Sequence, residues 1–500
     1  MLDWGRRFEG TVEMTQENQS STEAAPQDAH SSSTEAAPQD AHSSSTEPMP
    51  QDARAGGSKP TPQDARAAQE LLDFIGECPS MFHTAATIRK RLTAAGLTYL
   101  PETQPWNIEQ GGTYYTTRNS SSVIAFKVGT SLDNYHFQIT ASHGDSPTFK
   151  VKSNAELAGP GESQRLNVEV YGGAVDYTWF DRPLGIAGRV MVKSGNRVES
   201  RLYESAEPLA LIPSMPPHIQ RDINQQFSPN RQVDLCPLFS AGALGKSTLD
   251  AIIADELGIS ESDIVARDLF LVNRQQPCIW GAAGEFASSP KFDDLACAYT
   301  ALEAFLAAEN DRSISVFACF DNEEVGSNTK QGAMSTLLAD TLSRLNAALG
   351  RSCEDLRCAI AKSMLVSCDN AHAVNPNHPE RFDEGNRVFL NRGIVVKEAA
   401  NQKYCTDAFS RAVFCAICND AEIPYQTFAN RSDSPGGSTL GNLSNTQVSM
   451  HGVDVGLPQL AMHSSFETIG VRDVTLATRA LKAFYAADLR IDGADFVEFG

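Results

Sequence analysis

Helical and fully apolar segments alternate along the chain from residue 290 onward. The helical stretches cover 293–309, 334–350, 408–424 and 474–487, and apolar runs such as "SISVFACF" and "SMLVSC" lie between them. Strands that are apolar on both faces occur where helices cover both sides of a sheet. We therefore predict an α/β domain in which a mixed sheet is flanked by helices.

The middle of the chain has a different pattern. Short alternating strands with many glycines, as in "LNVEVYGGAVDYTWFDRPLGIAGRVMVK", are interrupted by one helix, "GKSTLDAIIADELG". Such a stretch is typical of a barrel-like β structure. We predict one α/β domain split by a β-rich insertion. The predicted limits are a disordered repeat tail at 1–66, the first part of the α/β domain at 67–151, the insertion at 152–288, and the second part at 289–500.

The first segment is of low complexity. "PQDA" recurs with a period of twelve residues, starting at Pro26, Pro38, Pro50 and Pro62, among Ser, Thr, Glu and Ala. This segment has almost no large apolar side chains to offset the entropy lost on folding. The composition favours a solvated tail, and a targeting or docking arm is the alternative.

Charge and cysteine content limit the possible partners. The formal net charge is −21, which argues against nucleic acid and anionic membranes as partners. Eleven scattered cysteines suit a reducing compartment, and the pair Cys415 and Cys418 lies in a helical stretch that favours core packing over zinc binding. No stretch is apolar enough for a membrane span or a signal peptide. We expect a cytoplasmic protein.

Acidic and imidazole side chains follow the apolar runs. In open α/β sheets, sites lie beyond the carboxyl ends of the strands. Two histidines and several carboxylates in such positions suit a hydrolytic site with two divalent ions, in which one carboxylate bridges them and another stays free as general base. These residues are His143, Asp145, Asp293, Glu323, Glu324, Asp369 and His463.

Each of these residues also has an ordinary structural explanation. A single histidine such as His463 is more often a core or surface residue, Asp293 is placed to cap a helix, and Asp369 to cap a loop. In "HGD", Asp145 is spaced to orient the imidazole of His143. The residues alone predict a metal-dependent hydrolase. The His and carboxylate set accepts zinc, manganese or cobalt.

Six motifs extend this interpretation. They are "SHGDSPTFKVK", "SSPKFDDLA", "FDNEEVGS", "SCDNAHAVNPN", "RSDSPGGSTLG" and "LPQLAMHS", in this order. The chain strongly resembles the aspartyl aminopeptidase family of dinuclear metallo-aminopeptidases, over roughly residues 67 to 500. The resemblance implies a zinc-exopeptidase α/β fold with an inserted β-rich dimerisation domain, and large, commonly dodecameric homo-oligomers.

The resemblance also implies a role for each matching residue. Asp293 matches the aspartate that bridges two metal ions, zinc by preference. His143 and Asp369 match the other ligands of one ion, and Glu324 and His463 those of the other. Further roles follow in the same way: Glu323 as general base, Asp145 as the carboxylate behind His143, His218 as a histidine reaching a neighbouring subunit's site, and Lys397 with Tyr404 as the lining of a pocket for an acidic side chain.

The implied activity is removal of N-terminal Asp or Glu from peptides by metal-bound hydroxide, with Glu323 as base. A dinuclear aminopeptidase of broader or neutral specificity and a catalytically silent shell-forming homologue are the alternatives. The chain departs from the family pattern without losing an implied ligand. We expect these departures to affect substrate preference and rate more than activity itself. They are Gly144, Asp294, Asn370, Asn375, Ser432 and Gly436.

Overall fold

The computed structural model describes residues 59–245 and 247–500, so most of the predicted tail lies outside the described residues. A mixed nine-stranded sheet forms the centre of the α/β domain, in the order β1-β2-β3-β13-β4-β14-β18-β16-β17. The strands are β1 Thr98–Tyr99, β2 Thr113–Arg118, β3 Ser122–Val128, β13 Ile314–Phe320, β4 Phe137–His143, β14 Met364–Cys368, β18 His451–Gly456, β16 Ile394–Glu398 and β17 Tyr425–Ala429.

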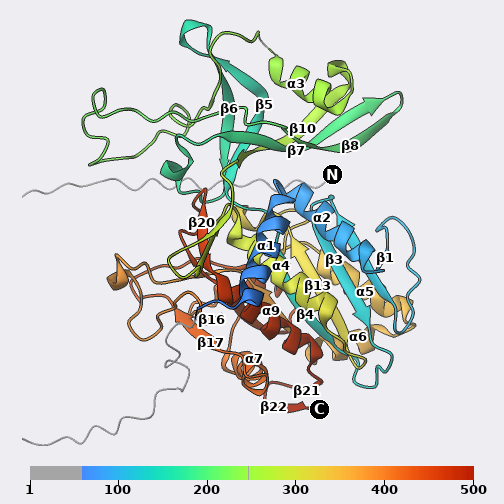
Figure 1. Cartoon of the computed structure of the whole chain (residues 1–500). Helices are drawn as coiled ribbons and strands as arrows, with labels where there is room; N and C mark the ends of the chain where they lie inside the picture. The colour runs from blue at the N-terminus through green and yellow to red at the C-terminus, as the bar shows by residue number, and fades with distance from the viewer. Residues whose placement is uncertain (1–58, 246) are drawn as a thin grey trace, which may run out of the picture. The chain divides into compact units, whose positions relative to one another are not determined.

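Helices cover both faces of this sheet, as predicted. One apolar core joins one face to α1, α2, α4, α7 and α9, and Figure 1 shows α1, α4 and α9 side by side. A second core joins the other face to α5, α6 and α8. The helices are α1 Pro62–Gly76, α2 Met81–Ala94, α4 Phe292–Ala307, α5 Leu337–Ala348, α6 Cys353–Ala361, α7 Ala408–Asp420, α8 Leu440–Ser444 and α9 Val471–Ala486.

The central strands are buried because their side chains pack against apolar neighbours on both faces of the sheet. In β13, Val316 and Ala318 pack in one core, while Phe317 and Cys319 pack in the other. β4 runs parallel to both β13 and β14. The carboxyl ends of these three strands therefore meet at one edge of the sheet.

The β-rich insertion is a separate six-stranded sheet in the order β8-β7-β10-β5-β6-β9, with its own apolar core. All of its pairings are antiparallel. This sheet begins at Thr148 and ends at Asn273. Its elements are β5 Thr148–Ala158, β6 Gln164–Tyr171, β7 Leu184–Ser194, β8 Arg197–Glu204, β9 Leu238–Ser240 and β10 Ile264–Asn273, with α3 Thr248–Leu257 between the last two.

A smaller five-stranded sheet is separate from the central sheet. Its order is β11-β12-β20-β19-β15, and it brings β12, which directly precedes α4, beside β20. A C-terminal hairpin is formed by the last two strands. The bounds are β11 Cys278–Trp280, β12 Phe286–Ser289, β20 Glu467–Gly470, β19 Pro458–Leu460, β15 Ala371–His372, β21 Leu489–Asp492 and β22 Phe496–Phe499.

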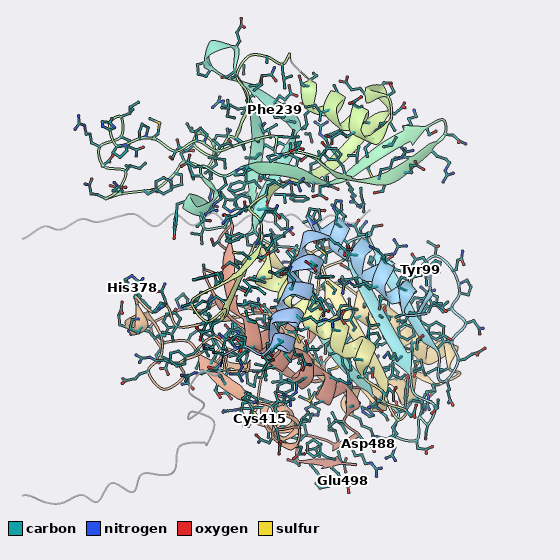
Figure 2. All side chains as sticks on the ribbon, in the orientation of Figure 1. Tyr99, Phe239, His378, Cys415, Asp488 and Glu498 are labelled. Atoms are coloured by element: carbon teal, nitrogen blue, oxygen red, sulfur yellow. The ribbon has the colours of Figure 1, made fainter. Side chains whose placement is uncertain are left out.

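Two details bear on the sequence predictions. Helix α1 begins at Pro62, before the predicted start of folded structure at Ala67, because the last repeat supplies a proline for the first helical turn and Thr61 and Asp64 form a capping box. Cys415 and Cys418 both lie in α7 and pack on the apolar core that contains α1, α4 and α9, as predicted. Cys415 is labelled in Figure 2. Within the described residues, no helix is long and apolar enough to cross a membrane.

Candidate metal centre

The predicted residues converge where the parallel strands end. His143 is the last residue of β4, the two glutamates open the short 3-10 helix Glu323–Val325 behind β13, and Asp369 follows β14. The other two predicted ligands come from outside the central sheet. Asp293 lies in the first turn of α4, and His463 lies between β19 and β20.

Asp293 lies at the centre of the group. Its Oδ1 is 3.5 Å from Nε2 of His143, and its Oδ2 is 3.4 Å from Nε2 of His463. Asp293 is 3% exposed, and its side chain does not cap α4, whose N-cap residue is Lys291. The helix-cap explanation is therefore wrong, and the two carboxylate oxygens face two different imidazoles.

Three overlapping groups have ligand atoms within 4.8 Å of one another: His143 with Asp293, Asp294 and Asp369; His143 with Glu323 and Glu324; and Asp293 with Glu324 and His463. Asp293 Oδ1 and Glu324 Oε1 are buried and have no hydrogen-bond partner. Buried carboxylate oxygens of this kind need a cation or a donor. Imidazole nitrogens beside carboxylate oxygens are the donor set that divalent zinc accepts, so two ions sharing Asp293 fit the residues present.

Asp145 contacts three of the predicted site residues through its carboxylate: Glu323, Glu324 and His143. Its Oδ1 accepts a hydrogen bond from the main-chain N–H of Glu323 at 3.1 Å, and its Oδ2 accepts one from that of Glu324 at 3.2 Å. Its Oδ1 also lies 3.3 Å from Nδ1 of His143, which leaves Nε2 of that ring for the centre. Asp145 therefore lies where its spacing from His143 predicts, since a carboxylate on the far nitrogen fixes the orientation of a ligand imidazole.

Glu467 is a residue that the sequence reasoning missed. It is 1% exposed, and its Oε1 accepts from the main-chain N–H of His463 at 2.7 Å while its Oε2 accepts from that of Asp293 at 3.0 Å. One carboxylate thus joins the segments that carry two of the central residues. The only signal in the sequence is an acid four residues after His463, which by itself has no special meaning.

The strand end Tyr171–Gly173 was also missed as part of the site. The Tyr171 hydroxyl donates to Asp145 Oδ2 at 2.7 Å, and Nδ1 of His463 lies 3.0 Å from the carbonyl oxygen of Gly173. The motif "YGG" is visible in the sequence as part of the family resemblance. Nothing in the motif itself indicates that it contacts residues of the centre.

The charges of the group depend on one another. Burial lowers the pKa of His143, but the neighbouring carboxylates of Asp145 and Asp293 raise it well above the usual value. Burial would raise the pKa of Asp293, yet the two imidazoles hold it below its usual range. Burial and neighbouring carboxylates raise the pKa of Glu323 to about 8. A site so rich in acids is one that a divalent cation would stabilise.

Two departures from the family pattern lie behind the centre. Asp294 is 0% exposed, its Oδ2 accepts from the main-chain N–H of His143 at 3.2 Å, and burial raises its pKa well above the usual value. A raised pKa favours the neutral acid, so Asp294 adds less negative charge beside Asp293 than an ionised carboxylate would. The Asn370 amide donates to the carbonyl oxygen of Phe292 at 2.8 Å and so braces the start of α4.

The predicted specificity residues lie beside Asp369. Lys397 is 2% exposed, and its Nζ is 3.6 Å from Oδ1 of Asp369 and 5.1 Å from the centre of the Tyr404 ring. Tyr404 is itself buried. His218 lies apart from them, as an exposed residue on the segment between β8 and β9 of the insertion. Its role toward a neighbouring subunit stays a prediction.

The chain is similar to known proteins over most of its length. A family model described as "Aminopeptidase I zinc metalloprotease (M18)" matches residues 74–485. A probable M18 family aminopeptidase 2 of Clostridium novyi is 43% identical over 426 residues, covering 84% of this chain and 98% of that protein. A protein with the same description from Pseudomonas aeruginosa is 39% identical over 429 residues, with the same two shares covered.

Solved structures are similar over most of the chain. The cryo-EM structure of an Ape4 and Nbr1 complex matches with a TM-score of 0.82 and 33% identity, covering 86% of this chain and 87% of that one. The mApe1 dodecamer of S. cerevisiae matches with a TM-score of 0.75 and 27% identity, covering 85% and 97%. An M18 aminopeptidase of Thermotoga maritima shares the fold, with a TM-score of 0.76 and 22% identity. The match covers 86% of this chain and 99% of that one.

Proposed function

This chain belongs to the M18 family of zinc metallo-aminopeptidases, and we propose that it removes N-terminal aspartate or glutamate from peptides. The observation that carries the acidic specificity is the position of Lys397, whose buried ammonium lies beside Asp369 at the edge of the centre. The centre already holds several carboxylates, so an acidic substrate side chain is repelled there unless a cation lies nearby. A buried cation therefore favours acidic over neutral residues.

Glu323 has the position expected of the general base. Its side chain is 14% exposed, whereas that of Glu324 is 3% exposed, so Glu323 is the more accessible of the two acids. We propose that its carboxylate takes the proton of the attacking water and later returns it to the leaving amine. Two divalent ions, when bound, would polarise the scissile carbonyl and lower the pKa of water. The residues that would hold these ions are His143, Asp293, Glu324, Asp369 and His463.

The role of Glu323 is tested with Glu323→Gln. This change keeps the shape of the side chain and removes the proton acceptor, so turnover of an aspartyl anilide is expected to fall about 10²- to 10⁴-fold. Zinc content, measured by atomic absorption on the same sample, is expected to stay at that of the unaltered protein. Turnover within twofold of the unaltered protein would exclude Glu323 as the base.

The specificity is tested with Asp-, Glu- and Leu-anilides on one preparation. We expect Lys397→Met to lower kcat/KM for the two acidic substrates at least tenfold more than for the leucyl substrate. Lys403→Met is the matched control, because Lys403 lies nearby and its Nζ makes a single long contact of 3.4 Å to the carbonyl oxygen of Gly436. An equal loss of kcat/KM for all three substrates would mean that Lys397 does not distinguish acidic from neutral substrate side chains. A preference of the unaltered protein for leucine would favour the alternative of neutral specificity.

We further propose that the chain acts as a homo-oligomer, as large as a dodecamer, in which His218 completes the site of a neighbouring subunit. The segment around His218 exposes large apolar side chains, which supports burial by a partner. Among them are Met215 at 47%, Ile219 at 71% and Val233 at 59% exposure.

Subunit mixing tests this assignment. His218→Ala and Glu323→Gln proteins are each expected to be nearly inactive, and co-expressed mixtures are expected to recover activity at sites that combine an intact Glu323 with an intact neighbouring His218. Light scattering on the same samples measures the oligomer size. Mixtures that stay as inactive as the separate variants would contradict a role between subunits, and a monomeric mass would contradict assembly.

A further inference from the structure

We propose that the β-rich insertion positions the metal centre of its own subunit, through the strand end Tyr171–Gly173, with Tyr171 as the main positioning residue. This inference rests on the proposed two-metal hydrolytic function and adds a role for the insertion beside assembly. It follows from contacts that reach both ends of the centre from one short segment of the insertion.

The first contact lies at the His143 end. The Tyr171 hydroxyl donates to Asp145 Oδ2 at 2.7 Å and accepts from the Asn322 side-chain amide at 2.8 Å. Both polar functions of this hydroxyl are therefore satisfied, and its direction is determined. Asn322 directly precedes the two glutamates, so the hydroxyl joins the segment that carries them to the carboxylate that orients His143.

Asp145 transmits this contact to the centre. Its two oxygens already accept the main-chain N–H groups of Glu323 and Glu324, and the imidazole of His143 lies beside Oδ1. Without the Tyr171 hydroxyl, Oδ2 keeps one bond of 3.2 Å and the carboxylate has more freedom to rotate. Because ligand residues and base would all shift with it, a small rotation affects the whole group.

The second contact lies at the His463 end. Nδ1 of His463 lies 3.0 Å from the Gly173 carbonyl oxygen, and the main-chain N–H of Val175 donates to the carbonyl oxygen of His463 at 3.0 Å. A carbonyl acceptor makes Nδ1 the protonated nitrogen and leaves Nε2 for the centre. The insertion thus determines the orientation of the second imidazole as well.

The close approach explains the two glycines. Gly172 has φ +80°, and a Cβ there would lie 3.1 Å from Cβ of Glu324, while a Cβ at Gly173 would lie 3.1 Å from Nδ1 of His463. A side chain at either position would push a central residue away. The strand end therefore lies directly against Glu324 and His463.

Packing keeps the tyrosine in place. Its ring makes an edge contact with Phe270 of β10 at 5.5 Å between ring centres, and it packs against the cluster of Met81, Phe82 and Phe270. Removing only the hydroxyl leaves these apolar contacts unchanged. Tyr171→Phe therefore isolates the hydrogen bond to Asp145 from the packing of the ring.

The test compares Tyr171→Phe with Tyr135→Phe. Tyr135 is a matched control, because its buried hydroxyl also donates to a side chain, Asn346, at 3.2 Å, far along the sheet from the centre. For Tyr171→Phe we expect zinc affinity, measured by competition with a chromophoric chelator, to fall about tenfold or more. We also expect an altered visible absorption spectrum of the Co²⁺-substituted protein, and a lower kcat with KM changed less than twofold.

The control variant is expected to keep the zinc affinity, the cobalt spectrum and kcat of the unaltered protein. Equal zinc affinities in the two variants would overturn the proposal. A double-mutant cycle with Asp145→Asn adds a second criterion, since the effects on zinc affinity must be strongly non-additive if Tyr171 acts through Asp145. Additive effects would also overturn it.

These measurements separate the inference from the proposed function. Zinc titration and cobalt spectra need no peptide, so they report on Tyr171 even if the protein prefers neutral N-termini. Failure of the unaltered protein to cleave acidic anilides would overturn the acidic specificity alone. Loss of metal affinity in Tyr171→Phe beyond that in the control would still support the positioning role.

Discussion

The Lys397 ammonium donates a hydrogen bond to the main-chain carbonyl oxygen of Asp369 at 2.7 Å, in a place where the lysine is 2% exposed. Burial would lower the pKa of Lys397, but Asp369 and the nearby Tyr404 and Asp454 outweigh burial and raise it. The cation is thus part of the framework that holds Asp369, in addition to its proposed role toward substrate. Loss of this cation leaves a buried acid without its partner.

We expect Lys397→Met to lower the melting temperature by several degrees, because breaking a buried ion pair from one side costs about 3–5 kcal/mol. Differential scanning calorimetry with excess zinc measures this shift. Lys403→Met removes a more peripheral ammonium, and it is expected to change the free energy of unfolding by less than about 0.5 kcal/mol. Similar melting temperatures for the two variants would show that the contact with Asp369 contributes little to stability.

Glu467→Gln is expected to weaken zinc binding about 10- to 100-fold. One oxygen becomes an amide N–H group that faces the main-chain N–H of either His463 or Asp293, so a donor meets a donor. Competition titration with a chelator measures the affinity. Glu303→Gln is the control: Glu303 lies on α4 in a partly exposed ion pair with Arg91 of α2, and its replacement is expected to leave zinc affinity unchanged. An unchanged affinity in Glu467→Gln would contradict the clamp between the two segments.

Metal removal is expected to destabilise the protein. The carboxylates around Asp293 repel one another, and binding of an ion to the folded state alone stabilises it by about 2.7 kcal/mol at a hundredfold excess over Kd. A strong chelator should therefore lower the melting temperature, and zinc should restore it. Asp293→Asn, which removes the shared carboxylate, is expected to respond much less. Equal melting curves with and without chelator in the unaltered protein would contradict a structural contribution of metal.

Acidification is expected to destabilise the fold through His83, a residue of α2. Burial and, less strongly, Lys291 lower the pKa of His83 to about 4, from an ordinary value of 6.5. The folded state then binds fewer protons than the unfolded chain between these values, so stability is complete above pH 6.5 and is lost as pH falls toward 4. The ring is partly exposed. We therefore expect the free energy of unfolding to be about 1 kcal/mol lower at pH 5 than at neutral pH, which is less than the full pKa shift would give.

Calorimetry between pH 5 and 7.5 tests this prediction. His83→Gln is expected to show a smaller fall in melting temperature over this range than the unaltered protein. His378→Gln is the control, because His378 is exposed and pairs with Glu380 on the surface. The same pH dependence in His83→Gln and in the unaltered protein would show that His83 does not titrate on unfolding.

Strand ends were the part of the site that could be predicted from sequence. A buried strand is a run of apolar residues, so a charge at its end is visible without a structure, as with Glu323 behind "SISVFACF". Parallel strands then bring His143 and Asp369 to the same edge by a general rule. The α/β class and the β-rich insertion were predicted for the same reason, since periodicity is a local property.

Residues that reach the site from other elements carry no such signal. Glu467 acts through main-chain N–H groups of residues in two distant segments, and Tyr171 acts from the insertion on Asp145. An isolated tyrosine or glutamate in these sequences is unremarkable, since nothing local distinguishes it from a surface residue. Only the folded chain brings these side chains within hydrogen-bond distance of their partners.

The sequence by itself determined the α/β class and the family, and it indicated the strand-end residues as candidate ligands, because apolar periodicity and contiguous motifs are local properties of the chain. Tertiary structure alone decided that Asp293 faces both imidazoles, that Lys397 is held against Asp369, and that the insertion touches both ends of the centre. These relations depend on distances between residues far apart in the sequence. Such distances depend on how whole helices and strands pack together, and this packing cannot be inferred from any single segment.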